Sequence, residues 1–234
     1  MNNALTIAVK DLRSDARAKQ VVPTMVLFSL VLVFLFTFAL PPGAGRVPTP
    51  LPAAGAVSAR EVSGQFLWVA FLFAAVIGFG MTAAQEKEGS RIEGLILAPV
   101  DPAFLFAGKA LANLAFLLLL QSFIFPAFLI LSGTPAGQIF PLIIPVALAA
   151  DIGLAAAGTL FAAASQYSRA RALILPLLLF PMVLPAVLAA SRLTSALLTT
   201  GGLSGEGRWF VLMLVYDVIF VTIGAVAFEF VIQE

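Results

Sequence analysis

Six long apolar runs dominate this chain of 234 residues. A helix needs about 20 apolar residues, at about 1.5 Å each, to cross about 30 Å of hydrocarbon. The runs cover residues 21–40, 66–84, 107–131, 139–164, 173–190 and 209–232. They are continuous rather than alternating, which excludes a transmembrane barrel, where only every second residue is apolar. The sequence therefore predicts an all-α integral membrane protein with six transmembrane helices.

The composition supports the same class. Hydrophobic residues make up 61% of the chain and charged residues 11%, which leaves too few polar side chains to cover a water-soluble globule. Little sequence remains between the runs for a soluble domain. We therefore expect a single transmembrane domain over residues 1–234.

The placement of basic residues predicts the orientation in the membrane. Nine of the 13 lysines and arginines precede the first run or lie near the connections after the second and fourth runs, and four lie in the alternate connections. The positive-inside rule then puts both termini in the cytoplasm. Trp68 and Trp209 fall at the outer interface, where an amphipathic ring is favoured. The first run is longer than the apolar region of a usual signal peptide, so we expect it to be retained.

The chain contains neither cysteine nor histidine. These absences exclude a disulfide framework and a thiolate metal site, and they remove the commonest ligand of metals and haem iron. No glycine-rich loop ending in Gly-Lys-Ser or Gly-Lys-Thr occurs, so we expect the chain not to be an enzyme that hydrolyses ATP itself. We predict no metal site, and the cofactor-binding residues are unknown.

Two segments outside the runs have amphipathic patterns. Residues 4–20 mix apolar and charged side chains, which suits a helix on the inner membrane surface or, alternatively, a solvated basic leader. Residues 85–102 form a charged cytoplasmic connection in which acidic and basic residues recur at helical spacing beside an apolar face. A short helix ending before Pro99 would fit this pattern, and so would an ordinary solvated loop.

The charged connection also carries a family resemblance. Residues 86–100, EKEGSRIEGLILAPV, followed by Ala107-Gly108-Lys109, resemble the acidic coupling segment and third-helix start of the haem exporter protein B family (CcmB). The ending of the chain, with YDVIF at 216–220 and FEFVIQE at 228–234, is similar to that family's ending. The similarity extends over the whole chain in length and in the order of its apolar runs.

This resemblance implies a function in an ABC transporter. The family has an ABC-2-type six-helix permease fold and serves haem export or delivery in cytochrome c maturation, in the bacterial inner membrane. ATP would be hydrolysed by a separate ATP-binding subunit, and haem would be substrate rather than bound cofactor. The positions implied to dock the ATPase are Glu86, Glu88, Gly89, Glu93 and Gly94.

The resemblance implies further partners as well. They are a haem-handling membrane protein, a small membrane subunit, a periplasmic haem chaperone and a second copy of the permease. Two mechanisms remain open: haem itself crosses through this subunit, or ATP hydrolysis drives release of the haem-loaded chaperone.

Two carboxylates inside the runs suggest an alternative. Asp151 lies near the middle of the fourth run and Asp217 about a third of the way into the sixth. A carboxylate there is costly unless it is paired, hydrated or protonated. Both residues are candidates for a proton-coupled secondary transporter, or for structural hydrogen bonds between helices. A noncatalytic scaffold for cytochrome assembly is a third possibility.

Glycine and proline mark the remaining features of the runs. Four glycines predict close helix contacts: Gly78, Gly80, Gly153 and Gly158. Three prolines predict kinks in the fifth run, either as hinges or as packing features: Pro176, Pro181 and Pro185. Residues 191–207 would suit a short helix at the outer interface.

Overall fold

The computed structural model describes residues 21–39, 59–88, 101–132, 136–165 and 171–233. Six of its α-helices are long and apolar enough to cross a membrane, and no strand occurs in these ranges. They are α2 (Val21–Ala39), α3 (Ala59–Glu88), α5 (Pro102–Ser132), α6 (Ala136–Ser165), α7 (Arg171–Thr200) and α8 (Gly207–Gln233). The predicted all-α fold with six membrane-length helices is confirmed. The interfacial helix predicted for residues 4–20 lies outside the described residues.

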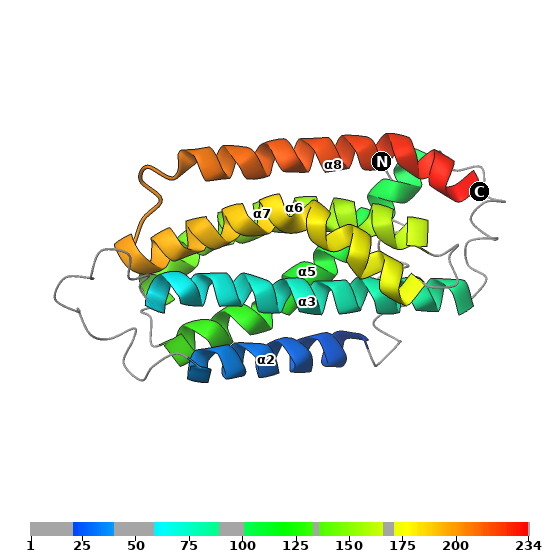
Figure 1. Cartoon of the computed structure of the whole chain (residues 1–234). Coiled ribbons are helices and arrows are strands. Elements are labelled where there is room, and N and C mark those ends of the chain that lie inside the picture. Colours follow the sequence, from blue (N-terminus) through cyan, green and yellow to red (C-terminus); the bar gives the residue numbers. More distant parts are fainter. Residues whose placement is uncertain (1–20, 40–58, 89–100, 133–135, 166–170, 234) are drawn as a thin grey trace.

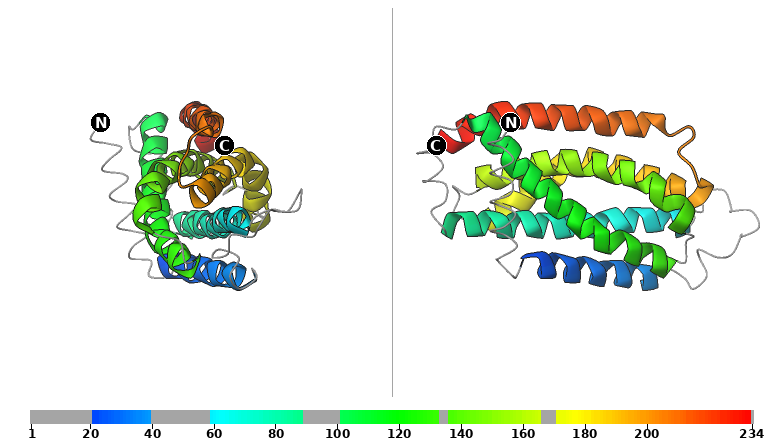
Figure 2. Two further views of the ribbon diagram at one scale, coloured as in Figure 1. Left: turned by 90° about the vertical axis from the view of Figure 1, so that its left-hand side faces the viewer. Right: turned by 180° about the vertical axis from the view of Figure 1, so that it is seen from behind.

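The six helices run alternately in opposite directions, so α2 begins at the same end of the bundle at which α8 finishes (Figure 1). Helices α3 and α6 are central, because 61% of the apolar span of each is buried inside the bundle. In α2 and α8 the buried share is 22%. Helix α2 packs on α3 and α5, and α8 packs on α6, α7 and α5. Helix α5 crosses the bundle obliquely (Figure 2). Thus α2 and α8 form opposite edges of the molecule.

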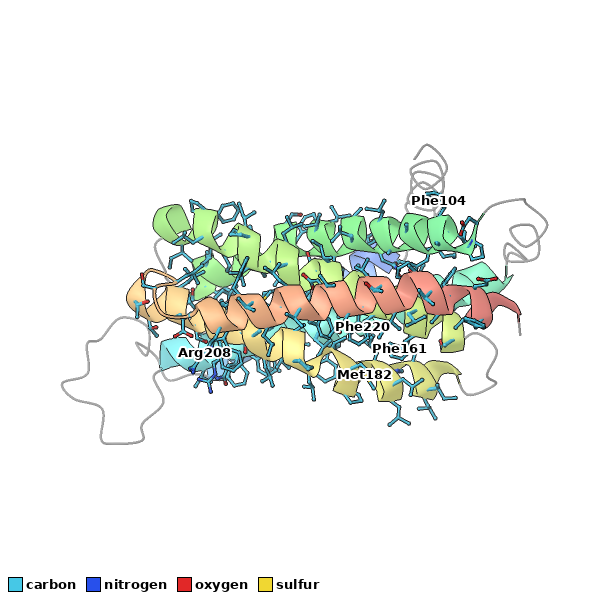
Figure 3. All side chains as sticks on the ribbon, turned by 90° about the horizontal axis from the view of Figure 1, so that it is seen from above. Phe104, Phe161, Met182, Arg208 and Phe220 are labelled. Atoms are coloured by element: carbon cyan, nitrogen blue, oxygen red, sulfur yellow. The ribbon has the colours of Figure 1, made fainter. Side chains whose placement is uncertain are left out.

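Local signals define the helix ends. At the start of α5, the Asp101 carboxylate accepts a hydrogen bond of 2.9 Å from the Ala103 N–H, and Pro102 occupies the first helical position. At the end of α7, Gly201 has a φ of 75°, and its N–H bonds the Leu197 carbonyl at 3.1 Å. These ends lie on opposite sides of the bundle, as the positions of Phe104 in α5 and Arg208 in α8 show (Figure 3).

Most helices extend a few residues beyond the predicted apolar runs, and α7 differs most. The expectation of a separate short helix over residues 191–207 was wrong, because α7 continues to Thr200. Its polar extension is buried against the bundle rather than solvated: Thr194 is fully buried, and the Ser191 hydroxyl donates to the Leu188 carbonyl at 2.9 Å. All three predicted prolines lie inside this helix.

Trp68 was expected at the outer membrane interface, but its side chain is buried between helices. The indole is only 1% exposed, so its ring does not face a lipid headgroup region. Its N–H donates to the Thr194 hydroxyl at 2.8 Å, and its ring makes edge contacts with Phe71 and Phe125. The tryptophan therefore joins α3 to α7 inside the bundle.

Several of the predicted glycine contacts are present. A Cβ on Gly78 would overlap the Met25 side chain of α2, and one on Gly158 would overlap the Phe79 ring of α3. A Cβ on Gly80 would meet only Leu175, at an ordinary 3.7 Å, so Gly80 is not needed for close approach. Glycines thus allow a close approach of α3 to α2 and of α6 to α3.

Candidate functional site

Asp151 lies at the centre of the bundle and is fully buried. The Gln121 side-chain amide of α5 donates a hydrogen bond of 2.7 Å to Asp151 Oδ1. No described group bonds Asp151 Oδ2. A buried carboxyl with one amide donor is half satisfied, so this residue is both a contact between two helices and a group that can bind a further proton or donor.

A second polar pair joins the same two helices. The Asn113 amide of α5 donates to the Thr159 hydroxyl of α6 at 2.7 Å, and that hydroxyl donates to the Ala155 carbonyl at 2.7 Å. The two interhelical bonds are eight residues apart on each helix, which corresponds to about 12 Å along the axes. Helices α5 and α6 are therefore pinned at two depths.

Asp217 and Tyr216 lie on the opposite side of α6, where α8 approaches Gly153. Their exposed fractions are 7% and 6%. A Cβ on Gly153 would overlap Asp217 Oδ1 and lie 2.5 Å from the nearest atom of the Tyr216 ring. Although the Asp217 carboxyl lies beside the Gly153 backbone, neither its Oδ1 nor the Tyr216 hydroxyl makes a hydrogen bond of acceptable geometry with a described group.

The two predicted carboxyls therefore lie at the same turn of α6 but on different faces of that helix. Asp151 belongs to that turn, and Asp217 contacts Gly153 two residues later. Two residues correspond to a rotation of about 200° around a helix, so α6 separates the carboxyls. Within the described ranges, no group of three His, Cys, Asp or Glu side chains could hold a metal ion. The arrangement of the two carboxyls suits hydrogen bonding and proton binding.

Two of the five predicted ATPase-coupling residues lie at the C-terminal end of α3. Glu86 and Glu88 belong to the last turn of that helix, which continues without a break from its apolar part. The expected separate helix over residues 85–102 therefore does not begin at Gln85. Gly89, Glu93 and Gly94 lie outside the described residues.

Sequence reasoning did not single out Gln121, Asn113, Thr159 or the Tyr216 hydroxyl as functional groups. A signal was available for Gln121, because an amide within a long apolar run needs a buried partner. The partner could not be assigned, since assignment requires the relative register of α5 and α6. Gly153 was expected to allow close helix contact, and the structure shows that the contacting group is polar.

In the part of the chain that the structure describes, six membrane-length helices packed around buried polar groups define a multi-pass membrane protein. A family model described as CcmB protein matches residues 2–233, so the chain belongs to the CcmB family. No curated protein matches the chain with significant similarity. Membership makes the chain a haem exporter permease subunit of cytochrome c maturation, within an ABC transporter system that has an ATP-binding partner. The family implies haem as the substrate of this transport system rather than as a bound cofactor.

Proposed function

We propose that this permease converts ATP hydrolysis by a separate subunit into movement of its helices, and that this movement drives haem transfer or release of a haem-loaded periplasmic chaperone. The family match over residues 2–233 is the observation that carries the proposal. The permease forms a single transmembrane domain, and ATP is hydrolysed by the separate subunit.

The course of α3 supports a coupling role for its inner end. The apolar window of this helix ends at Ala84, and the helix continues to Glu88, about 6 Å further along its axis. Helix α3 also packs on α2, α5, α6 and α7. A force applied to its charged last turn would therefore reach four other helices through direct packing.

The assembly that we propose has several components. Two copies of the permease bind two ATP-binding subunits at residues 86–94, and a haem-handling membrane protein, a small membrane subunit and a periplasmic chaperone complete the system. The permease lies in the bacterial inner membrane with both termini in the cytoplasm.

Charge reversal in the last turn of α3 tests the coupling interface. We expect E86K/E88K to reduce co-purification with the ATP-binding subunit at least severalfold, because cations on the partner would meet lysines instead of carboxylates. The control is E61K, a single charge reversal of the same kind near the opposite end of α3. The readout is the ratio of the two subunits after affinity purification from detergent.

Two results would count against this interface. One is unchanged assembly of E86K/E88K, and the other is an equal loss for E61K, which would indicate general damage to α3. ATPase stimulation by the reconstituted permease is a second readout. If the partner hydrolyses ATP at the same rate without this chain, a scaffold is favoured over a coupled permease.

A proton-coupled secondary transporter is the second candidate, because Asp151 and Asp217 are both buried within apolar helices. Such a protein would move substrate alone in response to a proton gradient. Reconstituted permease without its ATP-binding partner discriminates the two candidates: substrate movement that collapses with the gradient supports the secondary transporter.

A further inference from the structure

Helix α8 lies at an edge of the bundle and is held there by two close approaches. Tyr216 and Asp217 rest on Gly153 of α6, and the Phe106 ring of α5 rests on Gly224 of α8. The second contact is apolar and is extended by Phe228, whose ring lies 5.5 Å from that of Phe106. The first contact is polar, which makes the two attachments chemically different.

The polar attachment leaves hydrogen-bonding groups without partners. Among the described residues, three buried side-chain atoms have no hydrogen-bond partner, and two of them are the Tyr216 hydroxyl and Asp217 Oδ1. The third, Asp151 Oδ2, belongs to a carboxyl whose other oxygen is bonded by Gln121. The packing at Gly153 is too tight for even a methyl group beside Asp217 and the Tyr216 ring.

An unpaired buried polar group raises the free energy of the packing that buries it. Burial of two such groups at one contact makes this seating of α8 less stable than its apolar area alone would give. A conformation in which α8 leaves Gly153 relieves this cost where the opened gap admits water or polar groups of a partner, because hydrocarbon satisfies neither group. The free-energy difference between the seated and the displaced helix is thereby reduced.

We propose that Tyr216 and Asp217 form a release latch, which keeps α8 only weakly seated on Gly153 so that the helix leaves α6 during each transport cycle. The latch rests on the proposed function, because ATP hydrolysis by the partner supplies the displacement. The apolar contact between Gly224 and Phe106 keeps α8 attached at its inner part while the polar contact opens.

The first test removes the unpaired hydroxyl with Y216F, which keeps the ring. In purified permease in lipid nanodiscs, we expect Y216F to raise the melting temperature by a few degrees and to slow amide hydrogen exchange in α8. The matched control is T159V, which removes a hydroxyl that has two partners. We expect T159V to lower the melting temperature.

The second test changes the α6 side of the contact with α8. G153A places a methyl group against Tyr216 and Asp217, so we expect faster amide exchange in α8 and a lower melting temperature. G80A is the control, because the new methyl group would meet only an ordinary contact. It should match or slightly exceed the wild type, since alanine favours a helix more than glycine does.

The third readout is haem delivery by the complete complex, where we expect Y216F to be slower than wild type although it is more stable. A melting temperature of Y216F at or below that of wild type would show that the hydroxyl has a partner in the bilayer, and would overturn the latch. Unchanged delivery by a stabilised Y216F would overturn its part in the cycle. Failure of the proposed function has a different signature: wild-type permease would not stimulate the ATPase, while the stability results would stand.

Discussion

Asp151 and Asp217 have different surroundings although both are buried carboxyls beside the same turn of α6. Asp151 accepts a hydrogen bond from Gln121, whereas Asp217 meets the backbone at Gly153 and has no side-chain donor among the described residues. The sequence located both carboxyls within apolar runs. It could not distinguish them, because the difference depends on which residue of another helix lies opposite each one.

The Asp151 pair gives a prediction about charge. Asparagine retains an oxygen that can accept from Gln121, so we expect D151N to keep nearly wild-type stability. D151L leaves the buried amide unpaired and should cost about 1–3 kcal/mol. The double variant D151L/Q121L should recover most of this loss, because both partners then become apolar. Thermal unfolding in nanodiscs measures all three variants, and a D151N as unstable as D151L would show that the carboxyl itself is required.

At the level of the helices, the sequence predicted the central elements better than their polar ends. Continuous apolar residues identified all six membrane-length helices, since length and hydropathy are properties of a single segment. The C-terminal part of α7 was missed because Ser191, Thr194 and Ser195 have the composition of a loop. Their burial depends on tertiary contacts, including the bond from Trp68 and the close approach of Ser195 to Gly64.

The contact between α3 and α6 gives a prediction at this scale. Alanine normally favours a helix over glycine, but a methyl group on Gly158 would overlap the Phe79 ring. We therefore expect G158A to destabilise the protein by about 1–3 kcal/mol through overpacking, and F79L to restore part of the loss. G137A, on the same helix, is the control, because nothing lies within 4 Å of the new methyl group. Equal melting temperatures for G158A and G137A would contradict the close approach.

For the whole molecule, the alternation of helix directions fixes which connections share a side, while the orientation in the membrane rests on charge. The end of α3 and the end of α8 lie on one side of the bundle, and the connection between α7 and α8 lies on the other (Figure 1). The nine-to-four distribution of basic residues predicts that the first side is cytoplasmic.

Cysteine labelling measures this orientation without interference, because the chain has no cysteine. Ser204 and Phe104 are exposed. Ser204 lies in the connection just before Arg208, and Arg208 and Phe104 lie at opposite ends of the bundle (Figure 3). We expect a membrane-impermeant maleimide to label S204C in intact spheroplasts, and to label F104C only after the membrane is disrupted. The reverse pattern would place residues 86–94 outside the cell and remove any access of an ATP-binding subunit to them.

The two hydrogen bonds between α5 and α6 restrict how this bundle can change shape. Because the bonds have the same spacing on both helices, a slide of one helix past the other would break both bonds together. We therefore expect α5 and α6 to move together as one rigid pair. Only the other helices then change position relative to this pair during turnover. A crosslink between α5 and α6 should therefore leave the rate of transport unchanged.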